Sequence, residues 1–326
     1  MTAVPVGDVA LLIASVAALW FGARWLVDAA STLARRAGVS ALVVGLTVVA
    51  FGTSAPEITV SVGAALEGRG DVAVGNAVGS NVFNLGVVLG LVAAFVPFRV
   101  TETLVRRDAL AMAVATGLGT LVLVDLAVSR LEGGVLLGTL FVYLGWLVAA
   151  TRRSNAVESE ATANADDPRG SEPGWARGGS GVGRQIVRLL VGLALVVAGG
   201  RLLVDAATRI AVSAGVSEWV IGVTIVAAGT SLPELVTSVV AARRGEVAIA
   251  AGNVVGSNVF NLLGVLGLAA LVRPLAIAPA ALEGLAWLVG LTAVATVLLA
   301  TGRRLTRLEG IALVAIVAVY WITSVL

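Results

Sequence analysis

The sequence predicts an all-α membrane protein with about ten transmembrane helices in two inverted five-helix repeats. Three observations predict this fold. The 326 residues are 58% hydrophobic and 13% charged, with a mean hydropathy of +1.00, which is far too apolar for a soluble domain. Apolar stretches near the ~20 residues of a membrane-spanning helix recur along the chain. The two halves also carry the same polar motifs at one constant spacing.

The apolar stretches give the expected order of elements. In the first half they are residues 9–27, 41–66, 72–96, 110–126 and 131–150. In the second half they are residues 186–204, 216–242, 247–272, 280–299 and 308–326. Residues 151–183 are instead rich in Arg, Ser, Asn, Asp, Glu, Pro and Gly, which is typical of a soluble linker without regular structure. We therefore expect a first half at 1–150, a linker at 151–184 and a second half at 185–326.

The first three stretches contain the polar residues that need an explanation. Arg24 and Asp28 close the first stretch one helical turn apart, so we expect them to pair as an interface anchor. The second stretch contains Gly-Thr-Ser-Ala-Pro-Glu at 52–57. Proline removes a backbone donor, and a carboxylate at mid-membrane costs several kcal/mol unless it is compensated. The motif therefore predicts a helix break beside an acid. The third stretch carries Gly-Asn-Ala-Val-Gly-Ser-Asn-Val-Phe-Asn at 75–84.

The second half repeats these motifs in the same order. Glu234 follows Glu57 by 177 residues, and it closes Gly-Thr-Ser-Leu-Pro-Glu at 229–234. The same shift carries the glycine–asparagine motif of the third stretch to residues 252–261. One constant offset predicts an internal duplication. Because five is an odd number of spans, the second half enters the membrane from the opposite side, which predicts inverted repeats related by an axis in the membrane plane.

The arginines predict the orientation in the membrane. With the N-terminus outside, most arginines fall on the inner side, and the outer side receives Arg69, Arg130, Arg209 and Arg273, with Arg201 near that face. This bias places both termini outside and the linker in the cytoplasm of a multi-pass cell-membrane protein. It also explains the pI of 9.9 without nucleic acid as a partner. No basic leader precedes the first apolar stretch, so we expect no cleaved signal peptide.

The two helix breaks predict a cluster of oxygen ligands near mid-depth. The half-helix before each break would direct free carbonyls, its negative dipole end, into the gap. On the next helix, polar residues four apart form one stripe. The candidate ligands are the carbonyls of Ala50 and Ala227, the hydroxyls of Thr53, Ser54, Ser80, Thr230, Ser231 and Ser257, the amides of Asn84 and Asn261, and the carboxylates of Glu57 and Glu234.

An all-oxygen set of this kind suits a hard cation such as Ca²⁺. The chain has no cysteine and no histidine, which excludes thiolate and imidazole metal sites. Two carboxylates ~5 Å apart repel by roughly 3 kcal/mol at an effective dielectric of ~20, so the empty, doubly ionised site is unfavourable. It should hold Ca²⁺, several monovalent ions or protons. The alternative is that the polar groups are structural, and we favour that role for Asn76, Asn81, Asn253 and Asn258.

These motifs carry a family resemblance. Gly-Thr-Ser-x-Pro-Glu followed by Gly-Asn-x-x-Gly-Ser-Asn-x-Phe-Asn, present twice, resembles the alpha repeats of prokaryotic-type sodium/calcium exchangers in the calcium/cation antiporter superfamily. The resemblance implies ten helices, inverted repeats, one calcium site and neighbouring sodium sites. It implies that Glu57 and Glu234 bind both ions. It implies further oxygens from Thr53, Ser54, Ser80, Asn84, Thr230, Ser231 and Ser257.

One position departs from the resemblance. Several sodium-coupled members carry Asp where this chain has Asn261, so this site has two fixed acids and not three. An amide offers an oxygen but holds neither charge nor proton. Two acids balance the charge of one Ca²⁺, and this site is compatible with either Na⁺ or H⁺ as the exchanged ion.

The expected function is exchange of Ca²⁺ for Na⁺ across the cell membrane by alternating access at a midplane site. The alternatives are a Ca²⁺/H⁺ antiporter, with Glu57 or Glu234 carrying the proton, and a passive cation channel. We expect no enzyme activity, because no nucleophile is arranged with a base. We expect no cofactor beyond the transported ions. The expected partners are the lipid bilayer and those cations, with no nucleic acid and no obligate protein partner.

Overall fold

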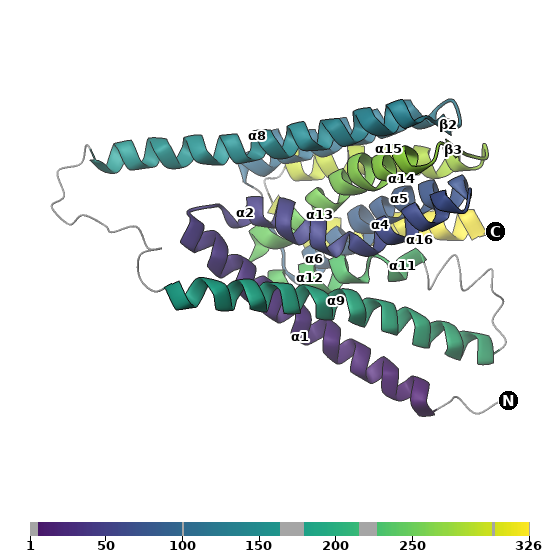
Figure 1. Ribbon diagram of the computed structural model, residues 1–326, viewed down its shortest axis with the longest axis horizontal. Helices are drawn as coiled ribbons and strands as arrows, with labels where there is room; N and C mark the ends of the chain where they lie inside the picture. The colour runs from purple at the N-terminus through teal and green to yellow at the C-terminus, as the bar shows by residue number, and fades with distance from the viewer. Residues whose placement is uncertain (1–5, 100, 164–178, 215–226, 302–303, 326) are drawn as a thin grey trace.

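The computed structural model describes residues 6–99, 101–163, 179–214, 227–301 and 304–325, which form a mostly helical bundle (Figure 1). The first-half helices, with η denoting π-helical turns, are α1 (Val6–Ala37), α2 (Ala41–Val44), η1 (Gly45–Val49), α3 (Ala50–Thr53), α4 (Ala55–Leu66), α5 (Gly70–Phe83), η2 (Asn84–Val88), α6 (Leu89–Phe95), η3 (Leu104–Ala109), α7 (Leu110–Leu123) and α8 (Arg130–Ala163). Those of the second half are α9 (Gly179–Ser213), α11 (Ala227–Gly229), α12 (Leu232–Arg243), α13 (Val247–Val259), η5 (Phe260–Val265), α14 (Leu266–Val272), α15 (Ala281–Thr301) and α16 (Arg307–Val325).

The prediction of a helical membrane protein is confirmed in its general form. Among the described residues, six helices are long and apolar enough to cross a bilayer. The pair Ala41–Thr53 and Ala55–Leu66, bent by 45°, raises this number to seven if it counts as one span. The number of ten spans is not reached by this criterion and stays a prediction. The predicted stretch 216–242 lies partly outside the described residues.

Several helices extend beyond their apolar stretches. α1 continues to Ala37, past the predicted end at residue 27. α8 continues to Ala163 and α9 begins at Gly179, so the expectation of irregular structure throughout 151–183 is wrong at both ends. The reason is that hydropathy marks the part of a helix that lies in lipid, whereas backbone hydrogen bonds continue wherever the residues tolerate helical geometry.

The predicted helix break is present in the first half and is one residue long. α3 ends at Thr53, and Ser54 adopts φ −80° and ψ 7° before α4 begins at Ala55. Pro56 occupies the first turn of α4, where its missing N–H costs little. In the second half α11 ends at Gly229 and α12 begins at Leu232, with proline again in the first turn.

α1 and α9 cross in antiparallel orientation. Arg209 Nε contacts Asp8 Oδ1 at 2.7 Å near one pair of ends, and Arg188 Nη2 contacts Asp28 Oδ2 at 3.1 Å toward the other. Asp28 also pairs with Arg244 of the α12–α13 turn. The predicted Arg24–Asp28 pair is therefore wrong within the described residues. Because α1 continues past residue 28, Asp28 lies against other helices and not at a free helix end.

Several contacts between the halves occur twice: shifting the residue numbers by 177 turns one contact into the other, with the two halves exchanged. The short strands β1 (Phe98–Arg99) and β2 (Ala127–Val128) correspond by this shift to β3 (Leu275–Ala276) and β4 (Arg304–Leu305). β1 pairs antiparallel with β4, and β2 pairs antiparallel with β3. In the same way α8 packs on α14 while α16 packs on α6. Each half thus completes its contacts with elements of the other half.

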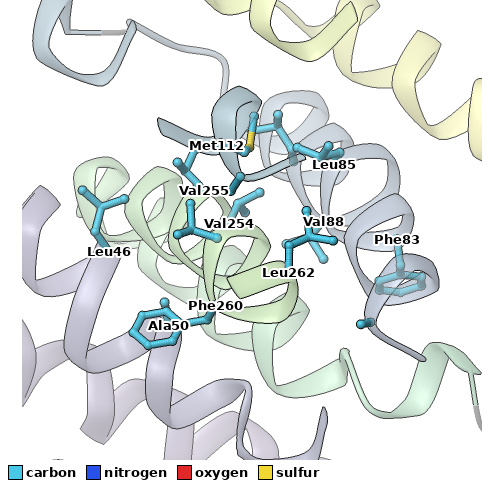
Figure 2. Packing of buried hydrophobic residues seen from close by; sticks show 14 of the residues in the cluster. Leu46, Ala50, Phe83, Leu85, Val88, Met112, Val254, Val255, Phe260 and Leu262 are labelled. Atoms are coloured by element: carbon cyan, nitrogen blue, oxygen red, sulfur yellow. The ribbon is translucent and has the colours of Figure 1, made fainter. Parts of the chain in front are cut away.

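The two helices that carry the polar stripes are the most buried spans. The span Val247–Val272 is 89% buried and Gly70–Phe95 is 72% buried, against 22–33% for the other four. Figure 2 shows buried apolar side chains of these two spans, among them Leu85 and Val88 from η2 and Val254 and Leu262 from α13 and η5. The protein core therefore surrounds the motifs that the sequence singles out.

Candidate metal centre

Two glutamates lie buried in the first turns of the helices that follow the breaks. Glu57 belongs to α4 and Glu234 to α12, and neither side chain is exposed. The break shortens each helix so that its first turn, where a negative charge is favoured by the helix dipole, lies inside the bundle. The sequence therefore places each acid at a helix N-terminus and away from lipid.

Each glutamate is bonded by a serine of the other half. Ser231 Oγ donates to Glu57 Oε1 at 3.2 Å, and Ser54 Oγ donates to Glu234 Oε1 at 3.1 Å. Serines of the polar stripes approach the same oxygens: Ser80 Oγ lies 3.4 Å from Glu57 Oε1, and Ser257 Oγ lies 3.5 Å from Glu234 Oε1. The structure thus brings the two acids and these four predicted serines together into one cluster.

The two threonines cross between the halves to asparagines. Thr53 Oγ1 donates to Asn253 Oδ1 at 3.1 Å, and Thr230 Oγ1 donates to Asn76 Oδ1 at 3.4 Å. Asn76 Nδ2 in turn donates to the Glu57 carbonyl at 3.2 Å. Its counterpart Asn253 donates to the Glu234 carbonyl at 3.4 Å. These amides hold the backbone of the acid-bearing turns, in agreement with the structural role that we favour for them.

A second group of amides lies deeper along the stripes and is less symmetric. Asn81 Nδ2 donates to the Asn258 carbonyl at 3.0 Å, and Asn261 Nδ2 donates to Asn81 Oδ1 at 3.1 Å. Asn258 Nδ2 donates within its own helix, to the Val254 carbonyl. Asn84 is fully buried, and neither atom of its amide has a partner among the described residues.

Four predicted ligands carry oxygens without a partner in the described part of the chain. They are Glu57 Oε2, Glu234 Oε2, Asn84 Oδ1 and Asn261 Oδ1. Buried polar atoms are rarely left unpaired, because each costs about 1–3 kcal/mol. Free carboxylate and amide oxygens beside bonded hydroxyls form the donor set that a hard cation prefers. The cluster therefore fits a cation as its missing partner.

The electrostatics of the cluster are set by two acids. None of the ion pairs among the described residues includes Glu57 or Glu234. In the same residues no group of three or more Asp, Glu, His or Cys side chains converges on one point. Two buried carboxylates without a basic partner repel each other, and a divalent cation balances their charge.

The predicted carbonyl ligands differ from expectation. The Ala50 carbonyl accepts the Ser54 N–H at 3.0 Å and lies 3.4 Å from Thr53 Oγ1, so it is not the free carbonyl that a wider break would leave. The missing N–H of Pro56 instead removes the helical donor of the Gly52 carbonyl, four residues earlier. Ala227 begins α11, directly after residues that the structure does not describe.

Sequence reasoning missed two serines that support the site. Asn76 Nδ2 donates to Ser61 Oγ at 3.0 Å, and Asn253 Nδ2 donates to Ser238 Oγ at 3.0 Å. Both serines are fully buried one helical turn after the glutamate of their helix. The shift of 177 relates Ser61 to Ser238, so the repeat itself carried the signal that would have identified them.

Comparisons with known proteins agree with this geometry. Residues 8–149 and 184–326 match the family described as sodium/calcium exchanger protein. The chain is 30% identical over 319 residues to the sodium/calcium exchanger MaX1 of Methanosarcina acetivorans, covering 90% of this chain and 91% of the relative. It is 39% identical over 274 residues to the inner membrane protein YrbG of Escherichia coli, covering 83% and 82%.

A solved structure agrees as well. The sodium-calcium exchanger NCX_Mj superimposes with a TM-score of 0.81 at 31% sequence identity, covering 96% of this chain and 97% of the other. A family match over both halves and a full-length structural match point to the same conclusion. The chain belongs to the sodium/calcium exchanger family.

Proposed function

We propose that this protein exchanges Ca²⁺ for Na⁺ across the cell membrane by alternating access at a site formed by Glu57 and Glu234. The carrying observation is that two fully buried acids, each bonded to a serine of the other half, retain one free oxygen each. The relative MaX1 is itself named a sodium/calcium exchanger. The family is one of transporters, and no enzyme activity or cofactor enters the proposal.

The proposed ligands follow from the donor set. Ca²⁺ takes six to eight oxygens and tolerates irregular geometry, so both carboxylates and several neutral oxygens can share it. The smaller charge of Na⁺ suits neighbouring groups of hydroxyl, amide and carbonyl oxygens. The proposed set is Glu57, Glu234, Thr53, Thr230, Ser54, Ser231, Ser80, Ser257, Asn84, Asn261 and Ala227. The Ala50 carbonyl is left out, because it already accepts the Ser54 N–H. When ions of one kind bind, they neutralise the negative charge of the two carboxylates. The site then no longer attracts ions of the other kind.

The proposed architecture is ten spans in two inverted repeats, with both termini outside and the linker in the cytoplasm. The antiparallel crossing of α1 and α9, which correspond under the shift of 177, supports an inverted relation. The reciprocal pairs β1–β4 and β2–β3 support a twofold exchange of the halves. Figure 1 draws the start of α1 and the end of α16 at one end of the bundle, and the end of α8 with the start of α9 at the other.

Proton-coupled calcium exchange is the second candidate, because of the two acids. Of the proposed ligands, only Glu57 and Glu234 can take up a proton, and the positions of Asn84 and Asn261 hold amides. If both acids release Ca²⁺ and bind protons, the free oxygens are satisfied without sodium. A passive cation channel is the remaining alternative, and the buried, break-associated acids favour a closed midplane site over an open pore.

The test is calcium flux in vesicles of the purified full-length protein. Vesicles loaded with ⁴⁵Ca²⁺ are diluted into medium with an opposing Na⁺ gradient, an opposing pH gradient, or neither. Sodium-driven efflux that stops when Na⁺ is replaced by choline supports the proposal. Efflux driven only by the pH gradient replaces it with proton coupling, and equal efflux without any counter-ion indicates a channel. The Glu57→Gln variant serves as the inactive protein in every arm.

A further inference from the structure

α1 packs against α12, and the corresponding helices of the other half do not pack to the same degree. The shift of 177 relates the α1–α12 interface to an α9–α4 interface. α1 and α12 are in extensive contact and are joined by the Asp28–Arg244 ion pair. Among the described residues, Leu193 of α9 lies against Gly52 of α3, beside the helix break of the first half. The two interfaces are therefore in different states.

Burial shows the same difference residue by residue. Leu26 and Val27 of α1 are fully buried, whereas their counterparts Leu203 and Val204 of α9 are partly exposed. On the facing helix, Val240 of α12 is 2% exposed, whereas its counterpart Gly63 of α4 is partly exposed. A Cβ at position 63 would meet no described atom within 4 Å. The α1–α12 interface is closed and the α9–α4 interface is looser.

The closed interface leads from the metal centre to a cluster of charges. Glu234, Thr237, Ala241 and Arg244 follow one another at helical spacing, so they lie along one face of α12. The Thr237 hydroxyl is fully buried and has no partner among the described residues. Its counterpart is Val60, so this polar group exists in one half only. The Thr237 hydroxyl therefore lies buried between Glu234 of the site and Arg244 along this face of α12.

The charge cluster links three elements at the end of that face. Asp28 of α1 pairs with Arg188 of α9 and with Arg244 beside α12. Arg35 Nη1 lies 3.2 Å from Glu246 Oε1, and Ser31 bonds to both of these residues. In the Asp28–Arg244 pair both side chains are partly buried, at 31% and 28% exposure, so this pair is less screened than a fully exposed one. In the second pair Glu246 is 27% exposed and Arg35 is 67% exposed.

The counterpart positions cannot form the same cluster. The shift of 177 relates Asp28 to Asp205 and Arg244 to Glu67, which would bring two like charges together. It relates Arg35 to Val212 and Glu246 to Arg69, which removes the second pair. The cluster can therefore form only on the α1–α12 side. The proposed topology places this side at the cytoplasmic surface.

We propose that the ion pairs of Asp28 with Arg244 and of Arg35 with Glu246 form a cytoplasmic latch that holds the α1–α12 interface closed over the Thr237 face. Opening this interface for cytoplasmic ion access separates α1 from α12, so these pairs must break. The latch therefore favours the conformation whose site opens toward the outside. This inference rests on the proposed function for its sidedness and for the ion that passes.

The test uses cysteine accessibility, because the chain has no cysteine of its own. Val240→Cys reports on the α1–α12 interface and Gly63→Cys reports on the α9–α4 interface. Each full-length protein is purified in detergent at one fixed ion composition and treated with a charged methanethiosulfonate reagent. Breaking the latch with Arg35→Glu, Glu246→Arg or Asp28→Asn should raise the rate at Val240→Cys by about fivefold, the scale of one ion pair, and lower it at Gly63→Cys.

Two controls make the result specific. The double variant Arg35→Glu with Glu246→Arg restores an ion pair and should return both rates toward the wild-type values, which a misfolded protein would not do. Asp205→Asn, the counterpart of Asp28→Asn, should leave the rate at Val240→Cys unchanged. Unchanged rates at both reporters in all latch variants overturn the latch. Altered labelling combined with absent vesicle exchange keeps the latch and overturns the proposed function, since labelling does not require transport.

Discussion

At the residue level, the candidate metal centre depends on bonds that cross between the halves. Ser54 and Ser231 each hold the glutamate of the opposite half, and the free oxygen of each glutamate is left for a ligand. Removing either acid therefore affects a site that both halves build. The two acids are not interchangeable with the surrounding amides, because only they carry charge.

Glu57→Gln and Glu234→Gln should each lower the rate of calcium exchange at least about tenfold, which corresponds to 1.4 kcal/mol of lost ion binding. The isosteric amide keeps an oxygen but removes half of the charge that balances Ca²⁺. The measurement is ⁴⁵Ca²⁺ flux in vesicles. Glu132→Gln is the control, because that exposed carboxylate caps α8 through Ser129 and lies outside the site. A fully active single variant at 57 or 234 contradicts the shared site.

Asn261→Asp tests how many charges the site tolerates. A third buried carboxylate adds about 3 kcal/mol of repulsion for each acid that lies ~5 Å from it when no cation is bound. The ion-free protein should melt at a lower temperature than the wild type. Ca²⁺ or Na⁺ should then raise the melting temperature by more than it does in the wild type, because an ion that binds more tightly stabilises the folded state more at the same concentration. An equal ion-induced shift in both proteins refutes this account of Asn261.

The identity of the site residues followed from the sequence far better than their bonding did. The repeated motifs indicated both acids and the four serines that approach them, but not the supporting Ser61 and Ser238. They could not indicate which hydroxyl bonds to which acid, because that depends on how the halves pack. The Ala50 carbonyl illustrates the limit: its bond to Ser54 follows from a break only one residue long, and sequence does not reveal the width of a break.

At the level of elements, glycines set how closely helices of opposite halves approach. A Cβ at Gly133 of α8 would lie 2.8 Å from the Gly267 carbonyl and 2.9 Å from Ala270 Cβ of α14. At the adjacent Gly134 the nearest atom would be Leu271 Cδ2 at 3.8 Å, which is ordinary contact. Small residues of this kind are what close packing of membrane helices requires.

Gly133→Ala should therefore destabilise the protein by about 1–3 kcal/mol, because backbone atoms of α14 have to move. Gly134→Ala is the matched control and should be neutral or slightly stabilising, since alanine favours helix. Thermal unfolding in detergent, monitored as the loss of monodisperse protein, measures the stability of both variants. Equal melting temperatures for the two variants would show that the α8–α14 contact is looser than the structure indicates.

The ends of elements were the least predictable part of the fold. Hydropathy located the lipid-embedded parts of the helices but not their polar extensions, such as the last turns of α1 with Arg35 and Arg36. The error at Asp28 has the same origin, because a residue taken for a helix end lies in mid-helix against α9 and α12. The two-residue strands were also not predicted, since each exists only through its partner in the other half.

At the level of the whole molecule, the distribution of arginine predicts a fixed orientation. The strand pair β1–β4 contains Arg99 and Arg304, which the proposed topology places inside. The pair β2–β3 lies close in sequence to Arg130 and Arg273, which the proposed topology places outside. Strands can pair only on one side of a membrane, so both pairs are consistent with the proposed topology.

Single cysteines test that topology directly. Glu67→Cys should react with an impermeant maleimide added to intact cells, because the proposed topology places the end of α4 outside. Glu102→Cys, in the exposed turn before α7, should react only after the membrane is permeabilised. Both side chains are exposed, so access to the reagent depends on sidedness and not on burial. The reverse pattern would invert the proposed orientation.

Each half supplies the serine hydroxyl that bonds to the glutamate of the other half. This arrangement has a consequence for the ancestry of the gene. A gene that encoded one half alone would produce an acid without the serine that holds it and strands without their partners. Two such polypeptides could supply each other only by inserting into the bilayer with opposite polarity. Fusion into one chain then allows each half to acquire its own arginine pattern, so that a single gene product fixes both orientations at once.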